Sequence, residues 1–65
     1  MHRFYVRFHV TRKILFRVDA AGAWSRFDAG AWSPVDVDVE AFLSDPFVDE
    51  LDADQAGALE VELVA

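Results

Sequence analysis

Residues 3–10, which read RFYVRFHV, alternate strictly between apolar side chains and side chains that carry a polar group. A period of two, built from β-branched and aromatic residues, is typical of a strand with one face in the core and the other in solvent. We therefore expect one set to point inward: Phe4, Val6, Phe8 and Val10. The other set is expected to point outward: Arg3, Tyr5, Arg7 and His9.

A second alternating run, ILFRVD at residues 14–19, follows after the short connection Thr11-Arg12-Lys13. Its pattern predicts three inward side chains: Ile14, Phe16 and Val18. It predicts three outward ones: Leu15, Arg17 and Asp19. Because the connection is short enough for a hairpin, we predict that the two runs pair antiparallel.

The tetrapeptide Gly-Ala-Trp-Ser occurs twice, at residues 22–25 and 30–33. Glycine adopts a positive φ without steric cost, which predicts a turn at Gly22 and another at Gly30. Each Ala-Trp-Ser then begins a new strand. We interpret Trp24 and Trp32 as caps on a small core, because a small domain needs its aromatic side chains for burial. The functional alternative is a tryptophan pair that stacks on a base, a sugar or a peptide.

Residues 35–40, with the sequence VDVDVE, allow two interpretations. They can form an edge strand with one acidic face, or an extended lead-in to a helix with Asp38 as its N-cap. In the second case Val37 and Phe42 form a hydrophobic staple. We favour the helix from residue 38 onward, because residues 40–45 show no period of two.

The dipeptide Asp45-Pro46 predicts a further helix, since aspartate is a good N-cap and proline suits the first helical position. Three apolar residues would then share one face: Phe47, Val48 and Leu51. Three carboxylates would share another: Asp45, Asp49 and Asp52. Gly57 is expected to end this helix. Residues 59–63, LEVEL, are predicted to form a last strand, with Leu59, Val61 and Leu63 inward.

The order of these elements predicts a single α+β domain over residues 1–65, with an antiparallel sheet of three to four strands and one or two short helices packed on one face. Sixty-five residues lie near the lower limit for independent folding, and the chain has no cysteine that could add a disulfide. Six Phe, two Trp and one Tyr must therefore form most of the core. We expect a monomer or a weak homodimer.

No constellation of catalytic or cofactor-binding residues is evident, so we expect a protein that is not an enzyme and that needs no cofactor or metal. A Gly-rich phosphate loop, an H-E-x-x-H sequence and a nucleophile elbow are all missing from the sequence. His2 and His9 have opposite strand parity and are not expected to share a metal. Charges interrupt the first ten residues, unlike a signal peptide, and no stretch approaches the roughly 20 apolar residues of a membrane span. We predict a soluble protein of a bacterial host cytoplasm that does not enter a membrane.

Charge is segregated along the chain. All six Lys and Arg lie at or before Arg26, whereas residues 27–65 hold eleven Asp and Glu and no Lys or Arg. Such a segment repels nucleic acid and attracts basic surfaces. Glu60 and Glu62 can pair across the sheet with the strand arginines. The acids of residues 36–54 are left without evident cations and are the predicted partner-binding residues: Asp36, Asp38, Glu40, Asp45, Asp49, Glu50, Asp52 and Asp54.

In its size, acidity, lack of cysteine and lack of catalytic motifs, the chain resembles the small phage-encoded inhibitors called anti-CRISPR proteins. More narrowly, it resembles those that block type I surveillance complexes by imitating DNA. The resemblance implies a stoichiometric inhibitor on the basic DNA- or PAM-reading surface of a Cas subunit, which does not itself bind nucleic acid. Its carboxylates would engage Lys and Arg side chains that normally hold phosphates.

Three other interpretations remain open. The acids can be a solvated face that keeps a small protein soluble. An apolar patch around Trp24, Trp32 and Val35 can serve a structural or antitoxin-like interaction module. A basic strand face can bind single-stranded nucleic acid, which we rank last because the net charge is −6. That face would consist of Arg3, Tyr5, Arg7, His9 and Arg17.

Overall fold

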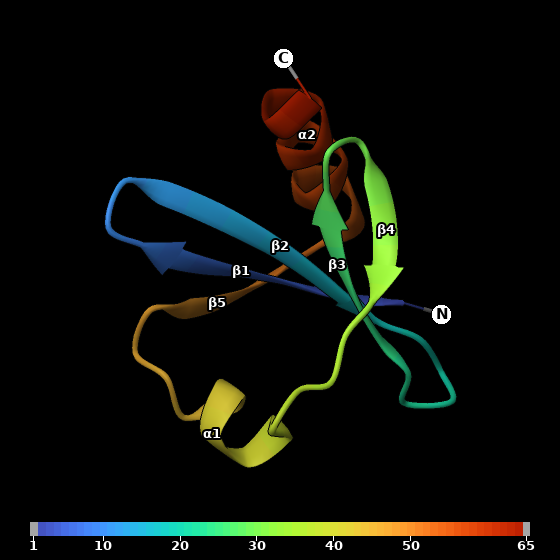
Figure 1. Cartoon of the computed structure of the whole chain (residues 1–65), viewed down its shortest axis with the longest axis vertical. Coiled ribbons are helices and arrows are strands. Elements are labelled where there is room, and N and C mark those ends of the chain that lie inside the picture. The colour runs from blue at the N-terminus through green and yellow to red at the C-terminus, as the bar shows by residue number, and fades with distance from the viewer. Residues whose placement is uncertain (1, 65) are drawn as a thin grey trace.

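The computed structural model describes residues 2–64, which form a twisted five-stranded antiparallel sheet and two helices (Figure 1). The α+β class is confirmed, with one strand more than the sequence predicts. The sheet order is β4-β3-β2-β1-β5. The elements, in chain order, are β1 (Arg3–His9), β2 (Arg12–Val18), β3 (Trp24–Asp28), β4 (Ala31–Pro34), α1 (Val39–Leu43), β5 (Val48–Leu51) and α2 (Ala53–Val64).

Strands β1 and β2 pair antiparallel over their full length, as predicted, with Val6 opposite Leu15 and Tyr5 opposite Phe16. Partners in this register point to the same face, so the two predicted inward sets lie on opposite faces of the sheet. Leu15, predicted to be outward, is completely buried, and Tyr5 is buried as well. The outward predictions for Leu15 and Tyr5 were wrong because the sheet is covered on both faces, whereas the alternation predicts burial of one face only.

The first core lies between the sheet and α2. Val6 and Leu15 from the sheet are buried against Ala56 and Leu59 from the helix. Four half-buried residues surround this cluster: Phe4, Phe27, Trp32 and Leu51. Burial of an aliphatic side chain contributes about 1.5–3 kcal/mol, so this small cluster supplies much of the stability that a chain of this length can have.

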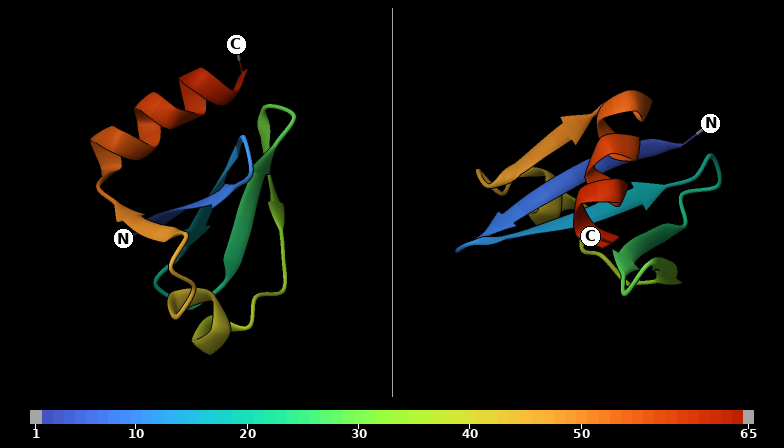
Figure 2. Two further views of the ribbon diagram at one scale, coloured as in Figure 1. Left: turned by 90° about the vertical axis from the view of Figure 1, so that its left-hand side faces the viewer. Right: turned by 90° about the horizontal axis from the view of Figure 1, so that it is seen from above.

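The second core lies on the other face and is aromatic. The ring of Phe42 from α1 packs edge-on against Phe16, Trp24 and Tyr5, with centroid distances of 4.9, 5.1 and 5.8 Å. Tyr5 also stacks on Trp24 at 5.5 Å. The helices α1 and α2 therefore cover opposite faces of the sheet, and not one face as expected. Figure 2 shows the sheet between them.

The turns follow the glycine signals of the repeated tetrapeptide. Ala29 and Gly30 join β3 to β4 with φ values of 52° and 80°. Positive φ values at both central residues are typical of a type I′ hairpin turn. Gly22 has a φ of 86° in the connection from β2 to β3. There the Asp19 carboxylate accepts hydrogen bonds from the Ala23 and Ala21 amides at 3.0 and 2.9 Å, and the Ala23 amide above all lowers the pKa of Asp19.

The acidic C-terminal half departs most from expectation. Residues 48–51 form strand β5 and not a helix, because they pair with the otherwise free edge of β1, with Leu51 opposite Phe4. The Phe8 amide donates to the Phe47 carbonyl at 2.9 Å and extends this pairing. Asp45 starts a turn in which the Val48 amide donates to its carbonyl at 3.1 Å. The local helix-start signal at Asp45-Pro46 is therefore overridden by a strand pairing.

The last helix, α2, begins at Ala53 and includes residues 59–63, which were wrongly predicted to be a strand. Its start is fixed by a reciprocal capping box: the Gln55 amide donates to the Asp52 carboxylate at 2.7 Å, and the Asp52 amide donates to the Gln55 side-chain oxygen at 3.0 Å. Gly57, which was expected to end a helix, lies inside this one. The spacing of Ala56 and Leu59 on one helical face explains why both are buried.

Gly57→Ala is expected to stabilise the protein. A Cβ added at Gly57 meets no heavy atom within 4 Å, and alanine within a helix is favoured over glycine by about 0.5–1 kcal/mol. Thermal unfolding followed by circular dichroism should show a melting temperature several degrees higher. Gly22→Ala is the matched control and should lower it, because φ at Gly22 is 86°. A Gly57→Ala protein with an unchanged or lower melting temperature would contradict a continuous α2.

Candidate protein-binding surface

The eight predicted partner-binding carboxylates are spread over four local environments and do not form one helical row. Asp36 and Asp38 precede α1, and Glu40 lies in its first turn. Asp45 lies between α1 and β5, and Asp49 and Glu50 belong to β5. Asp52 and Asp54 lie at the start of α2. The predicted helical face of Asp45, Asp49 and Asp52 does not exist, because β5 occupies its middle.

Two of these carboxylates cap helices. Asp38 accepts a hydrogen bond from the Ala41 amide at 3.3 Å, which confirms it as the N-cap of α1. Asp52 has the corresponding position at α2 through its bond with the Gln55 amide. A carboxylate at a helix N-terminus satisfies a free amide and interacts favourably with the helix dipole. Both residues therefore have a structural role, whatever they do for a partner.

Asp45 is neutralised within the fold. Its Oδ2 accepts a hydrogen bond from Arg7 Nε at 2.9 Å, and its Oδ1 accepts one from the Phe47 amide, also at 2.9 Å. The Phe47 amide, and after it the Arg7 guanidinium, holds the pKa of Asp45 below its usual value of 3.8. The Asp45 side chain is only 19% exposed. The Asp45 carboxylate is therefore not free to bind a partner.

Asp49 and Glu50 are both exposed, but they leave β5 in opposite directions. Asp49 is opposite Val6 and shares the α2 face, whereas Glu50 is opposite Tyr5 and shares the α1 face. Because β5 is an edge strand, both carboxylates remain accessible from the side of the sheet. Within residues 2–64, Asp45 is the one acid of the 36–54 segment that forms an ion pair.

Exposed apolar side chains are interleaved with these acids, which the sequence analysis did not predict. Val39 and Leu43 lie one turn apart on α1 and are 43% and 52% exposed. Phe47, just before β5, is 61% exposed. These three residues are hereafter called the apolar trio. Figure 1 shows α1 and the connection to β5 at the same end of the molecule. The sequence signal was the spacing of Val39 and Leu43, but their exposure could not be read from it.

The two tryptophans are packing residues, as interpreted from the repeat, and they lie on opposite faces. Trp24 belongs to the aromatic core under α1. Trp32 packs beside Phe27 on the α2 face, donates from Nε1 to Glu60 Oε1 at 2.9 Å, and is covered by the Arg17 guanidinium 4.4 Å from its ring. A single apolar patch around Trp24, Trp32 and Val35 is therefore not formed.

The basic strand face is not assembled as a binding surface either. Tyr5 is buried, Arg7 is bonded to Asp45, and Arg17 lies on the face opposite Arg7. Across residues 2–64, no group of three or more His, Asp or Glu side chains is placed to hold a metal ion. Neither helix has the length and apolar character needed to cross a membrane.

Comparison of the chain with protein-family models, with curated proteins and with solved structures finds no match. A function for the chain is therefore argued from its own sequence and geometry.

The Asp45 carboxyl should titrate below 3.8 in the folded protein. Because its folded pKa is lowered, the stability it contributes is present above its ordinary pKa and is lost as the pH falls through the folded value. An NMR titration of the side-chain carbonyl carbon measures this midpoint. Arg7→Gln should raise it only part of the way, since the Phe47 amide bond remains. Arg3→Gln is the control and should leave it unchanged. A midpoint at or above 3.8 would contradict the Arg7–Asp45 geometry.

Proposed function

We propose that this protein is a stoichiometric binding protein that docks on a basic protein surface through α1 and β5. One observation carries the proposal: the apolar trio is exposed among carboxylates that have no cationic partner in the described chain. The free acids are Asp36, Glu40, Asp49, Glu50 and Asp54.

Because this surface combines carboxylates with exposed apolar side chains, it is better explained by binding to a partner than by a need for solubility. Acids alone are explained by a solvated face, but a face kept for solubility does not need Leu43 and Phe47 half exposed within it. Apolar surface that is rimmed by polar groups is typical of protein interfaces. In such an interface the carboxylates accelerate association with a basic partner, and the apolar side chains supply most of the affinity.

A basic groove that normally holds nucleic acid is the partner surface with the matching chemistry. The resemblance to anti-CRISPR proteins makes a Cas subunit of a type I complex the candidate, with inhibition by competition for the DNA- or PAM-reading surface. The structure changes the form of this hypothesis. Because the helical row of carboxylates is absent, competition does not require a copy of the phosphate spacing, and local charge together with the apolar trio suffices.

The alternative is a structural or antitoxin-like module that associates through apolar contacts alone. The apolar trio also favours this function, and it replaces the tryptophan patch that the sequence suggested. The two functions differ in what the acids do. A charge-guided inhibitor loses binding when the acids are neutralised or the salt concentration is raised, whereas an apolar module does not.

The proposal is tested by a mobility-shift assay with purified type I Cas complexes and target DNA. Excess protein should reduce DNA retention. The triple variant Glu40→Gln, Asp49→Asn and Glu50→Gln should inhibit about tenfold less, since exposed charge pairs contribute about 0.2–1 kcal/mol each. Leu43→Ser should weaken inhibition about tenfold or more through lost apolar contact.

Matched controls separate the alternatives. Glu62→Gln removes a carboxylate near the other end of the molecule, where it pairs with Lys13 at 3.3 Å, and should inhibit like the native chain. Unchanged DNA retention across the panel of complexes would overturn the inhibitor function. Light scattering measures the oligomeric state. A homo-oligomer that is dissociated by Leu43→Ser but not by the triple charge variant would establish the apolar module instead.

A further inference from the structure

The two hairpins of the sheet separate from one another at the end opposite α1. Pairing between β2 and β3 covers only Phe16 to Val18 on β2. Strand β2 extends four residues beyond this point, from 12 to 15, and β3 extends to Asp28. Figure 1 shows the β1–β2 and β3–β4 hairpins pointing in different directions. A notch of about 480 Å³ lies between them, beside the last turn of α2.

One residue of β2, Lys13, directs its backbone amide and carbonyl toward this notch. In an antiparallel sheet an inner strand bonds to a neighbour on each side, and β2 bonds to β1 along its whole length. Across residues 2–64, the strand pairing of β2 on its other side begins only at Phe16. Leu15 is completely buried, so the accessible part of this edge is residues 12–14, with Lys13 at its centre, although it belongs to an inner strand. Such an edge is a template for an added strand.

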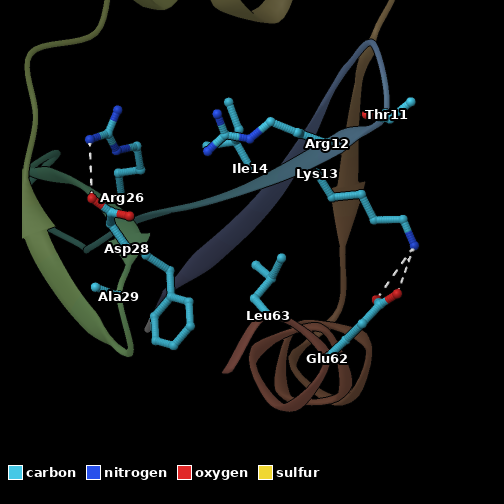
Figure 3. Close-up of a pocket in the computed structure, with 10 residues that line it drawn as sticks. Thr11, Arg12, Lys13, Ile14, Arg26, Asp28, Ala29, Glu62 and Leu63 are labelled. Carbon is cyan, nitrogen blue, oxygen red and sulfur yellow. Dashed lines mark hydrogen bonds and ion pairs between the residues drawn. The ribbon is translucent and has the colours of Figure 1, made fainter. Parts of the chain in front are cut away.

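The notch is lined by cations from two strands. Arg12 and Lys13 come from β2 and Arg26 comes from β3 (Figure 3). Across the described chain no carboxylate forms an ion pair with Arg12, and Arg26 has only an exposed contact of 3.7 Å with Asp28 on its own strand. Lys13 is bonded to Glu62 at 3.3 Å, also in an exposed position. Exposed pairs of this kind are weak, so these cations can exchange their partners.

Apolar side chains complete the lining. Phe27 and Leu63 line the notch from β3 and α2. Ile14 lines it from β2, beside Arg12. Arg12 and Arg26 leave the sheet on one side, whereas Lys13 and Phe27 leave it on the other. An extended peptide, whose side chains alternate between two sides, matches this division. A single compact anion would reach the cations of one side only.

We propose that the notch binds an acidic segment of a partner protein in extended conformation, as a short added strand along residues 12–14 of β2, centred on the Lys13 backbone. About three residues fit this length of strand at roughly 3.3 Å each. The peptide backbone pairs with β2, its carboxylates on one side meet Arg12 and Arg26, and its side chains on the other side meet Lys13, Phe27 and Leu63. This site is independent of the acidic surface and of the proposed function.

The experiment is an NMR titration of the 15N-labelled full chain with the capped hexapeptide Glu-Val-Glu-Val-Glu-Val. Amide shifts are expected at residues 12–14 and 26–28, and not at α1. The double variant Arg12→Gln and Arg26→Gln should weaken binding roughly tenfold. Arg3→Gln is the control, because Arg3 is opposite Val18 at the other end of β2, and it should bind like the native chain.

Two further probes decide the ligand class. The capped peptide Lys-Val-Lys-Val-Lys-Val should cause no shifts at the notch. Inorganic pyrophosphate should bind more weakly than the acidic peptide, and an equal or tighter affinity would overturn the extended-peptide proposal in favour of a phosphate site. No shifts at residues 12–14 with the acidic peptide, or equal weakening by Arg3→Gln, would overturn it as well.

Discussion

The register between β1 and β2 is the constraint on which the rest of the structure depends. With Val6 opposite Leu15 and Tyr5 opposite Phe16, both faces of the central strand pair carry large apolar side chains. Each face then needs its own cover. Helix α2 provides Ala56 and Leu59 on one side, and α1 provides Phe42 on the other. A slip of one residue would exchange every side chain between the faces and leave both helices without a matching surface.

Short-range signals were sufficient for the N-terminal half of the fold. The alternation of residues 3–10 and 14–19 gave the hairpin, and Gly22 and Gly30 gave the turns, because each signal acts between neighbours along the chain. The sequence could not show which side chains of β2 face which side of the sheet, because Leu15 and Phe16 are adjacent and both apolar. For the C-terminal half, the predictions were wrong where contacts with residues distant in the sequence determine the secondary structure. Residues 48–51 are a strand because β1 offers a free edge. Residues 59–63 alternate like a strand but belong to α2, whose residues Ala56 and Leu59 pack against the sheet.

The candidate surface was found from the sequence in outline only. The density of acids in residues 36–54 is a property of composition, and Asp38 as a cap follows from its local context. Local context does not show that Asp45 meets Arg7, a partner 38 residues away, or that Leu43 remains exposed while Phe42 beside it is packed. Both facts depend on how α1 is placed against the sheet. The free acids and the apolar trio are therefore structural findings.

The net charge of −6 describes this molecule poorly, because its charges are separated in space as they are along the chain. The longest axis is 31 Å. Figure 1 shows α1 near one end and the turns of the two hairpins, whose residues line the notch, away from it. At physiological ionic strength the Debye length is about 8 Å, so a partner at one end is screened from charges at the other. A basic partner at α1 encounters the free acids and not the arginines of the notch. Under the proposed function, the arginines of the notch therefore do not oppose docking of a basic partner at α1.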